Sequence, residues 1–236
     1  IVHLGALAGV PKSTKNPHAY TKVNVNGTVN LLDFANKHDV KKFVFASSSS
    51  VYGNREDKKV HEEDNVMRAV SVYGATKVAG EVLCHAFHSV FGLNISVARI
   101  FGPIYGPLQR PYGMLAQRAI NYTHNNKTLS VFGRYGLDTS KDSTYIDDQV
   151  NGLMLALDKC SGFEVFNLGT SSPSSIRTLI HSVQNAHAKN LNFELISPNK
   201  ADVVSSADIS KAREHLDYEP KMDFSEGLRR QVEIFN

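Results

Sequence analysis

Short apolar runs and helical patterns alternate in the first part of the chain, and this alternation constrains the fold more than any other feature. The runs 1–4, 42–46 and 94–99 are strand-like, and the apolar centre of 42–46 is continuous, as in strands buried on both faces of a sheet. Between them, 17–36 and 73–90 carry apolar residues at helical spacing. Strands that alternate with helices form parallel sheets with right-handed crossovers, so the sequence predicts an α/β fold.

The pattern changes after Phe101, where turn signals cluster. Gly-Pro and Tyr-Gly-Pro come first, and Arg-Pro-Tyr-Gly follows them. We therefore expect a second, smaller unit at 102–236, with 144–170 returning to the main sheet. Within it the sequence predicts helices near 114–124, 147–158, 174–188, 208–216 and 223–235, and short strands at 129–132, 163–168 and 193–196.

Composition and charge argue against several classes of protein. The 236 residues carry a net charge of +3, with no basic tract of the kind that binds nucleic acid. No apolar run reaches membrane-spanning length, and no signal peptide is recognisable. Cys84 and Cys160 form no CxxC pair and the histidines lack ligand spacing, so we expect no disulfide framework and no metal site. A reducing, cytoplasmic setting fits this use of cysteine.

Tyr73 and Lys77 stand four residues apart in the second predicted helix. Residues at i and i+4 share one face of a helix, and a cation beside a phenol lowers the pKa of the phenol. A tyrosine of this kind can take a proton from an alcohol at neutral pH. The same spacing also arises by chance as an exposed helix pair, which would contribute about 0.2–0.5 kcal/mol and no chemistry.

A run of serines at 47–50 follows the predicted strand 42–46. In open parallel sheets, ligands bind at the carboxyl ends of the strands. A serine hydroxyl at this place could therefore bond the same substrate oxygen that Tyr73 deprotonates. The alternative is a polar loop that follows a strand and has no catalytic part.

Segments spread over nearly the whole chain resemble, in order, those of the extended short-chain dehydrogenase/reductases, the NAD-dependent epimerase/dehydratase family. The serine run with Val-Tyr-Gly at 51–53, followed by Tyr-x-x-x-Lys at 73–77, is similar to the active-site pair of that family. The other similar segments are His-Leu-Gly-Ala-Leu-Ala-Gly at 3–9, Asn-Val-Asn-Gly-Thr at 24–28, Ile-Tyr-Gly-Pro at 104–107, and 141–148, 166–169, 207–212 and 218–220.

The resemblance implies a Rossmann-like doubly wound parallel sheet, with its first strands missing, and a smaller C-terminal substrate-binding lobe. Residues 1–101 would be a truncated dinucleotide-binding domain and 102–236 the lobe, and the cofactor would be NAD. Tyr73 would act as general base and acid, Lys77 would lower its pKa and hold the nicotinamide ribose, and Ser48 would position the substrate. The implied cofactor-binding residues are Ala6, Asn24, Ser47, Tyr73 and Lys77, and the implied substrate-binding residues are Ser48, Ser49, Gly102, Arg110 and Lys141.

The serine run discriminates between reactions within the family. The 4,6-dehydratases carry Thr-Asp-Glu where Ser48, Ser49 and Ser50 stand, and hydroxyls at the last two positions cannot replace that acid and base. The segment 8–13 resembles epimerases that act on UDP-glucuronate or N-acetylated UDP-hexoses. The resemblance therefore implies epimerisation of a nucleotide sugar at C4, of a UDP-hexose or UDP-uronate, through a transient 4-keto intermediate.

The largest departure from the family is an absence. Its Gly-x-x-Gly-x-x-Gly turn, which cradles the cofactor pyrophosphate, does not occur in the sequence. Because Ile1 already lies in a strand-like run, we expect an N-terminally incomplete chain that binds NAD poorly. Lys141 stands where the family often has arginine, and lysine lacks the bidentate grip on phosphate.

Two alternative functions stay open at this point. One is another NAD(P)-dependent short-chain oxidoreductase, and the other is a non-catalytic remnant that has lost its cofactor site. A further expectation from the family is a homodimer joined through the two predicted helices 17–36 and 73–90, whose apolar residues lie at helical spacing.

Overall fold

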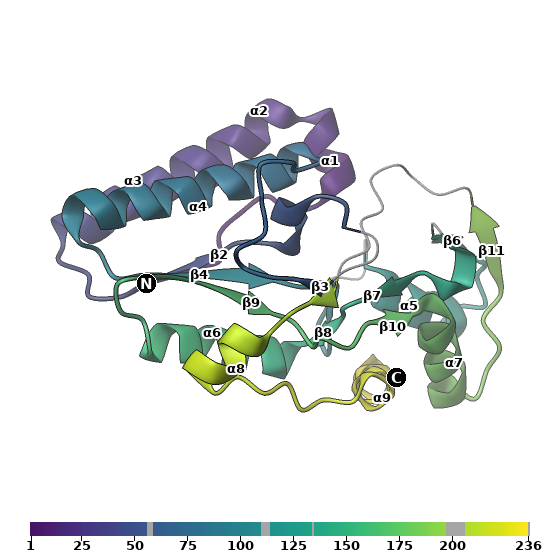
Figure 1. Cartoon of the computed structure of the whole chain (residues 1–236). Coiled ribbons are helices and arrows are strands. Elements are labelled where there is room, and N and C mark those ends of the chain that lie inside the picture. Colours follow the sequence, from purple (N-terminus) through teal and green to yellow (C-terminus); the bar gives the residue numbers. More distant parts are fainter. Residues whose placement is uncertain (56–58, 110–113, 134, 197–205, 236) are drawn as a thin grey trace.

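The computed structural model describes residues 1–55, 59–109, 114–133, 135–196 and 206–235. Its main sheet has four strands in the order β1-β2-β4-β9, and every neighbouring pair is parallel (Figure 1). The strands are β1 (Val2–His3), β2 (Phe43–Ala46), β4 (Ile95–Ile100) and β9 (Phe163–Leu168). The predicted α/β fold with a parallel sheet is confirmed.

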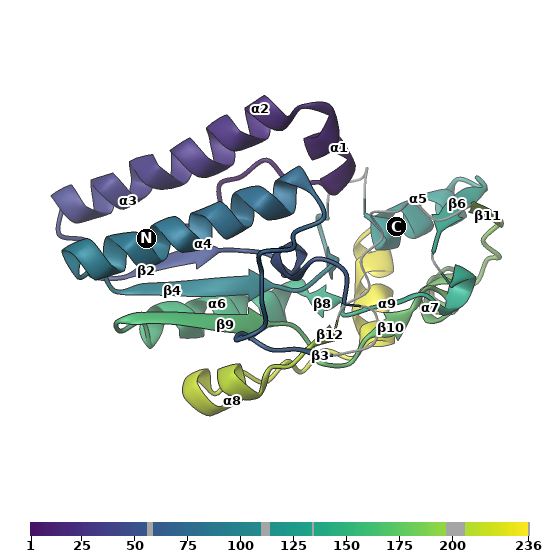
Figure 2. The same cartoon turned by 45° about the horizontal axis from the view of Figure 1, so that its top comes forward.

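Helices cover both faces of this sheet. One face carries α1 (Val10–Lys15), α2 (Pro17–Tyr20), the π-helical turn η1 (Thr21–Asn26), α3 (Gly27–Lys37) and α4 (Val72–Phe91). The other face carries α6 (Ile146–Asp158) and α8 (Ser210–Leu216). Figure 2 shows α3 and α4 running side by side along the first face. This doubly wound arrangement is the Rossmann-like architecture that the resemblance implies.

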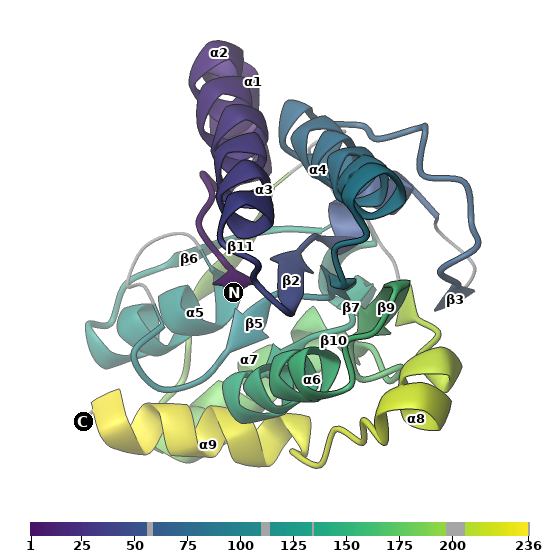
Figure 3. The same cartoon turned by 90° about the vertical axis from the view of Figure 1, so that its left-hand side faces the viewer.

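Apolar side chains on both faces of β2 hold the layers together. Phe43 and Phe45 are buried in one cluster with Leu32 of α3. Val44, between them, is buried in a second cluster with Leu153 of α6. Successive side chains of a strand point to opposite faces, so a strand that is covered on both sides is apolar throughout. An end-on view accordingly shows α4 and α6 on opposite sides of the sheet (Figure 3).

The remaining elements form a smaller lobe with a hydrophobic cluster of its own. Its helices are α5 (Leu115–His124), α7 (Ile176–His187) and α9 (Phe224–Phe235), and its longest strand pair is β6 (Leu129–Phe132) with β11 (Phe193–Ile196). The shorter elements are η2 (Ser49–Tyr52), β3 (Lys59–Val60), β5 (Ile104–Tyr105), η3 (Gly136–Asp138), β7 (Ser140–Lys141), β8 (Thr144–Tyr145), β10 (Ser174–Ser175) and β12 (Ser206–Ala207).

The chain returns to the main sheet after this lobe has begun, since α6 lies on the sheet and β9 pairs with β4. The division into two domains at residue 101 stays a prediction. No helix in the described part of the chain has the length and apolar character that crossing a membrane requires. Nor do the described residues bring together three or more His, Cys, Asp or Glu side chains that could hold a metal ion.

Gly80 sets how closely α4 lies against β2. A Cβ atom on Gly80 would lie 2.3 Å from Cζ of Phe45, whose ring is 1% exposed and has little room to move. Gly27 of α3 is a matched control, since a Cβ atom there meets nothing within 4 Å. We expect Gly80→Ala to be less stable than Gly27→Ala by about 1–3 kcal/mol in urea unfolding, because it overpacks the core. Equal stability of the two variants would show that α4 moves away from β2 at no cost.

Candidate active site

The start of α4 lies directly against the serine run. Ser71 is the N-cap, and its hydroxyl accepts a hydrogen bond from the Gly74 amide at 3.0 Å. A Cβ atom on Gly74 would lie 2.7 Å from the carbonyl oxygen of Ser50. The absence of a side chain at this position therefore lets the first turn of α4 approach the backbone that follows β2.

The predicted pair of Tyr73 and Lys77 faces the carboxyl end of β2. The side chain of Ser48 lies near enough to the phenol of Tyr73 to favour its charged form, while the Ser48 hydroxyl donates to the Ser50 hydroxyl at 3.2 Å. Lys77, one turn later, donates from Nζ to the carbonyl oxygen of Ala46 at 2.7 Å, and it is 4% exposed. Ser48, Tyr73 and Lys77 thus come together at the edge of the sheet where ligands bind in folds of this kind.

Burial raises the pKa of Tyr73, and the neighbouring side chain of Ser48, which acts to lower it, offsets this only in part. The pKa of Tyr73 is therefore raised overall, and a lowering contribution from Lys77 stays a prediction. Lys77 Nζ lies 6.0 Å from the centroid of the Tyr73 ring and 5.0 Å from that of Phe45, with its hydrogen bond directed at β2. At this separation, loss of hydration is the larger effect on the phenol.

Burial also lowers the pKa of Lys77, to about 8, although Cys84 and Glu81 act to raise it. The cation in turn adds to burial in lowering the pKa of His3, whose Nε2 lies 3.0 Å from the hydroxyl of Thr28. Lys77 is therefore a buried base close to the point of losing its proton, which is a common property of groups at functional sites.

Asn24 fastens the segment after β1 to α4. Its side chain accepts from the Leu7 amide at 2.8 Å and donates to the Leu7 carbonyl oxygen and to Oγ1 of Thr76, each at 3.0 Å. Asn24 is 3% exposed and lies in the π-helical turn η1, a feature that often occurs at functional sites. Ala6 directly precedes Leu7, whose backbone Asn24 holds, and cofactor binding by Ala6 and Asn24 stays a prediction.

The other serines of the run differ in what their hydroxyls bond. Ser47 is buried, and its hydroxyl donates to the carboxylate of Glu81. Ser48 caps η2 by accepting from the Ser50 amide at 3.2 Å. Ser49 is half-buried in the same turn. Cofactor binding by Ser47 and substrate binding by Ser49 stay predictions.

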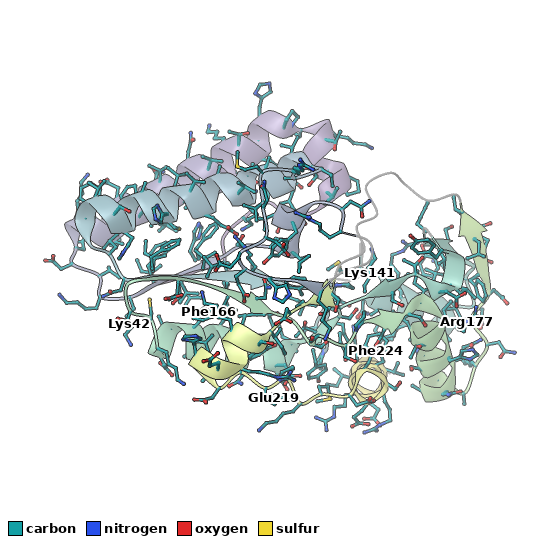
Figure 4. All side chains as sticks on the ribbon, in the orientation of Figure 1. Lys42, Lys141, Phe166, Arg177, Glu219 and Phe224 are labelled. Atoms are coloured by element: carbon teal, nitrogen blue, oxygen red, sulfur yellow. The ribbon has the colours of Figure 1, made fainter. Side chains whose placement is uncertain are left out.

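The remaining predicted substrate-binding residues follow later in the chain. Gly102 is exposed just after β4, and so stands at the same edge of the parallel sheet as Ser48. Lys141 is half-buried in β7, on the side of the small lobe that is nearest to the main sheet (Figure 4). Arg110 lies outside the described residues. Binding of substrate by these three residues stays a prediction.

Two buried charges beside the site were not predicted. Glu81, one turn after Lys77, accepts from Arg99 Nη2 at 2.8 Å and from Arg99 Nε at 3.1 Å. The two side chains are 8% and 6% exposed. The sequence did hold one signal, because an arginine within the apolar run 94–99 must find a partner if that run is a buried strand.

The fold and the arrangement of Ser48, Tyr73 and Lys77 define a class, the enzymes of the short-chain dehydrogenase/reductase type. Comparison with known proteins narrows it. The family model for GDP-mannose 4,6 dehydratase matches residues 1–231. The chain is 40% identical over 234 residues to the UDP-glucuronate 4-epimerase of Thermodesulfobacterium geofontis, over 98% of this chain and 71% of that relative. It is 34% identical to UDP-glucuronate 4-epimerase 1 of Arabidopsis thaliana, over 98% of this chain and 58% of that relative.

Solved structures agree with these relatives. The UDP-glucuronic acid 4-epimerase from Bacillus cereus, in complex with UDP-glucuronic acid and NAD, superposes with a TM-score of 0.91 at 33% identity, over 99% of this chain and 74% of that one. The UDP-glucose 4-epimerase of Thermus thermophilus, in complex with NAD, superposes with a TM-score of 0.92 at 27% identity. This match covers 99% of this chain and 76% of that one. The chain belongs to the GDP-mannose 4,6-dehydratase family, within the extended short-chain dehydrogenase/reductases.

Proposed function

We propose that the protein catalyses NAD-dependent epimerisation of a nucleotide sugar, a UDP-hexose or UDP-uronate, at C4. One observation carries the proposal: Ser48 lies beside Tyr73, and one helical turn later the Lys77 ammonium donates to the Ala46 carbonyl oxygen at the carboxyl end of β2. The names of the relatives support it, because they are 4-epimerases of UDP-sugars, and the neighbours solved with NAD support NAD as the cofactor.

The three residues have separate parts in this reaction. Tyr73 takes the proton of the C4 hydroxyl, and it returns a proton when the transient 4-keto sugar is reduced on its opposite face. Ser48, beside Tyr73, holds the reacting oxygen close to the phenol. Lys77 stabilises the phenolate through its charge. When bound, NAD would supply a reversible hydride acceptor for C4, so that no net oxidation would occur.

The residues around Lys77 fit one half of that cofactor. An ammonium has three N–H donors, and one of these goes to the Ala46 carbonyl oxygen, so the others suit the two hydroxyls of a ribose. Asn24 holds the backbone of Leu7 beside the same helix. No Gly-x-x-Gly-x-x-Gly turn occurs in the 236 residues, so they contain no pyrophosphate cradle of that kind. We assign to this chain the nicotinamide-ribose side of the site.

Elimination of water is the reaction for which the family model is named, and the serine run argues against it. A 4,6-dehydratase needs an acid and a base besides Tyr73, and Ser49 and Ser50 offer hydroxyls instead. The test is to incubate the complete protein with NAD and, separately, UDP-glucuronate, UDP-glucose, UDP-N-acetylglucosamine and GDP-mannose. We expect the C4 epimer of at least one UDP-sugar. A 4-keto-6-deoxy product would replace the proposal with a dehydratase.

The pKa of Lys77 predicts how the activity falls in alkali. With a pKa of about 8, Lys77 is charged below this pH and neutral above it. Because the charged form stabilises the Tyr73 phenolate, kcat/KM should decline as the pH rises through about 8. Lys77→Arg stays charged to far higher pH, so the decline should move upward in that variant. An alkaline limb that Lys77→Arg leaves in place would belong to another group.

The outer face of α3 and α4 is the surface that we propose for a homodimer. Phe34, Val82 and Val90 on these helices are 49%, 60% and 71% exposed. Val82→Glu is expected to convert a dimer into a monomer in light scattering, because it places a charge in an apolar contact. Val150→Glu is the control, since Val150 lies on α6, on the opposite face, and is 48% exposed. A wild-type protein that is monomeric at micromolar concentration would contradict this proposal.

We also propose a cytoplasmic location, on the chemistry of the cysteines. Cys84 and Cys160 are both free and buried, and burial raises the pKa of the Cys84 thiol, which makes it unreactive. Free thiols of this kind are the usual state of cysteine in a reducing compartment. Localisation of the tagged complete protein by microscopy or fractionation would test this point.

A further inference from the structure

Three side chains of α4, each one helical turn after the last, lie against the end of β2 and the serines that follow it. Tyr73 and Lys77 make two of these contacts, as described above. The third belongs to Glu81, which accepts the hydrogen bond of the Ser47 hydroxyl. Residues four apart share one face of a helix, so the three contacts form a single row along α4.

Glu81 has little freedom to leave this row. The guanidinium of Arg99 bonds both of its carboxylate oxygens, at 3.1 Å and 2.8 Å, and a planar fork of donors fixes the orientation of a carboxylate. Arg99 is held in turn by the hydroxyl of Tyr52 at 2.9 Å, which donates to Asn167 of β9 at 2.6 Å. All four side chains are buried. The oxygen that Ser47 contacts is therefore anchored through β4 to the far strand of the sheet.

We propose that Glu81 is a positioning residue for the Ser48–Tyr73 pair and acts through Ser47. Ser47 directly precedes Ser48, so fastening its hydroxyl to α4 sets the spacing between Ser48 and the tyrosine on that same helix. The inference rests on the proposed function, in which this pair transfers the proton. A misplacement of about 1 Å between reacting groups can lower a rate by roughly 10²-fold, so small errors in this spacing matter.

The charge of the Glu81 carboxylate also supports the site. Glu81 acts to raise the pKa of Lys77, against the lowering that burial causes. The side chain thus supports the middle contact of the row by its charge and makes the last contact by its hydrogen bond. Neither effect requires Glu81 to touch the substrate or the cofactor.

The hydrogen bonds that link Ser47, Glu81, Arg99, Tyr52 and Asn167 form one network. Two buried hydroxyls in it, those of Ser47 and Tyr52, give a matched pair of variants. Ser47→Ala removes the hydroxyl that Glu81 holds, and Tyr52→Phe removes the one between Arg99 and Asn167. Ser47→Ala is expected to lower kcat about tenfold, with the KM for the sugar nucleotide unchanged, because it weakens positioning and not binding. Tyr52→Phe is expected to lower the stability of the protein and to leave kcat as it is.

Amide hydrogen exchange, measured before any ligand is added, gives a readout that does not depend on turnover. We expect the amides of 47–51 to exchange at least about tenfold faster in Ser47→Ala than in the wild-type protein. In Tyr52→Phe their exchange rates should not change. Glu81→Asp keeps the charge that Arg99 needs and shortens the reach to Ser47 by one methylene. It should behave as Ser47→Ala does, and the double variant Ser47→Ala/Glu81→Asp should lose nothing more, because both changes break one contact.

Two outcomes would overturn the inference. One is an equal loss of kcat in Ser47→Ala and Tyr52→Phe, in proportion to their loss of stability, which would make the network purely structural. The other is unchanged exchange at 47–51 in Ser47→Ala. If the wild-type protein epimerises no nucleotide sugar, the proposed function falls, and the exchange comparison still decides whether Glu81 positions the serine run.

Discussion

Tyr73→Phe in the complete protein is expected to lower kcat by about 10²–10⁴-fold, the range that a general acid–base group contributes. The substitution removes only the phenol oxygen, which lies beside Ser48, and keeps the ring in its place. Binding of NAD and of the sugar nucleotide should therefore change little. Steady-state kinetics measure the loss, and calorimetric titration with each ligand measures the retained binding.

Tyr218→Phe is the control for this experiment. It also removes one phenol oxygen, which donates to the Gly169 carbonyl oxygen at 3.1 Å in the core below the sheet. Its kcat should stay close to that of the wild-type protein. If Tyr73→Phe keeps more than about a tenth of the wild-type turnover, another group transfers the proton and the assignment of Tyr73 is wrong.

Arg99→Gln is expected to lower the free energy of unfolding by about 3–5 kcal/mol, because it leaves the carboxylate of Glu81 buried without its ionic partner. The two side chains are 6% and 8% exposed, so water cannot replace the lost contact. Urea denaturation followed by circular dichroism measures the change. Replacing both partners with apolar residues, as in Glu81→Leu/Arg99→Met, should regain much of the stability, since a buried pair is often no better than a packed core.

Arg213→Gln is the matched control for the buried pair. Arg213 and Glu219 have the same forked geometry, with Nε and Nη2 at 2.8 Å and 2.9 Å from the two carboxylate oxygens, but their side chains are 48% and 56% exposed. The expected loss there is only about 0–1 kcal/mol, because an exposed pair exchanges its contacts with water. A loss for Arg99→Gln no greater than for Arg213→Gln would mean that Glu81 becomes hydrated when its partner is removed.

Elements with strong local patterns could be predicted from the sequence. β6, β9 and β11 have the predicted bounds, because short apolar runs between turn signals need no information from elsewhere in the chain. The predicted helix 17–36 is interrupted by η1, where Asn24 bonds Leu7 and Thr76. The pair β3–β12 was not predicted, because two-residue strands that pair at long range leave no periodic signal.

In the site, too, local features could be predicted and contacts between distant elements could not. Tyr73 and Lys77 could be proposed from their spacing in one helix, and a serine of the run from its place at a strand end, while the choice of Ser48 came from the family resemblance. The pair of Glu81 and Arg99 joins a helix to a strand, so its geometry depends on how α4 packs against the sheet. The raised pKa of Tyr73 was not predicted for a related reason: spacing along a helix says nothing about burial.

The central claim is that C4 of a nucleotide sugar is oxidised and then reduced again, with Tyr73 moving the proton and NAD supplying the hydride chemistry. It is tested most directly with a UDP-sugar carrying deuterium at C4, incubated with the complete protein and NAD in ordinary water and followed by NMR. We predict that the C4 epimer forms and that both epimers keep their deuterium, because the hydrogen leaves and returns as hydride without meeting solvent. Deuterium lost to water as fast as the epimer appears, or no epimer at all, would contradict the account.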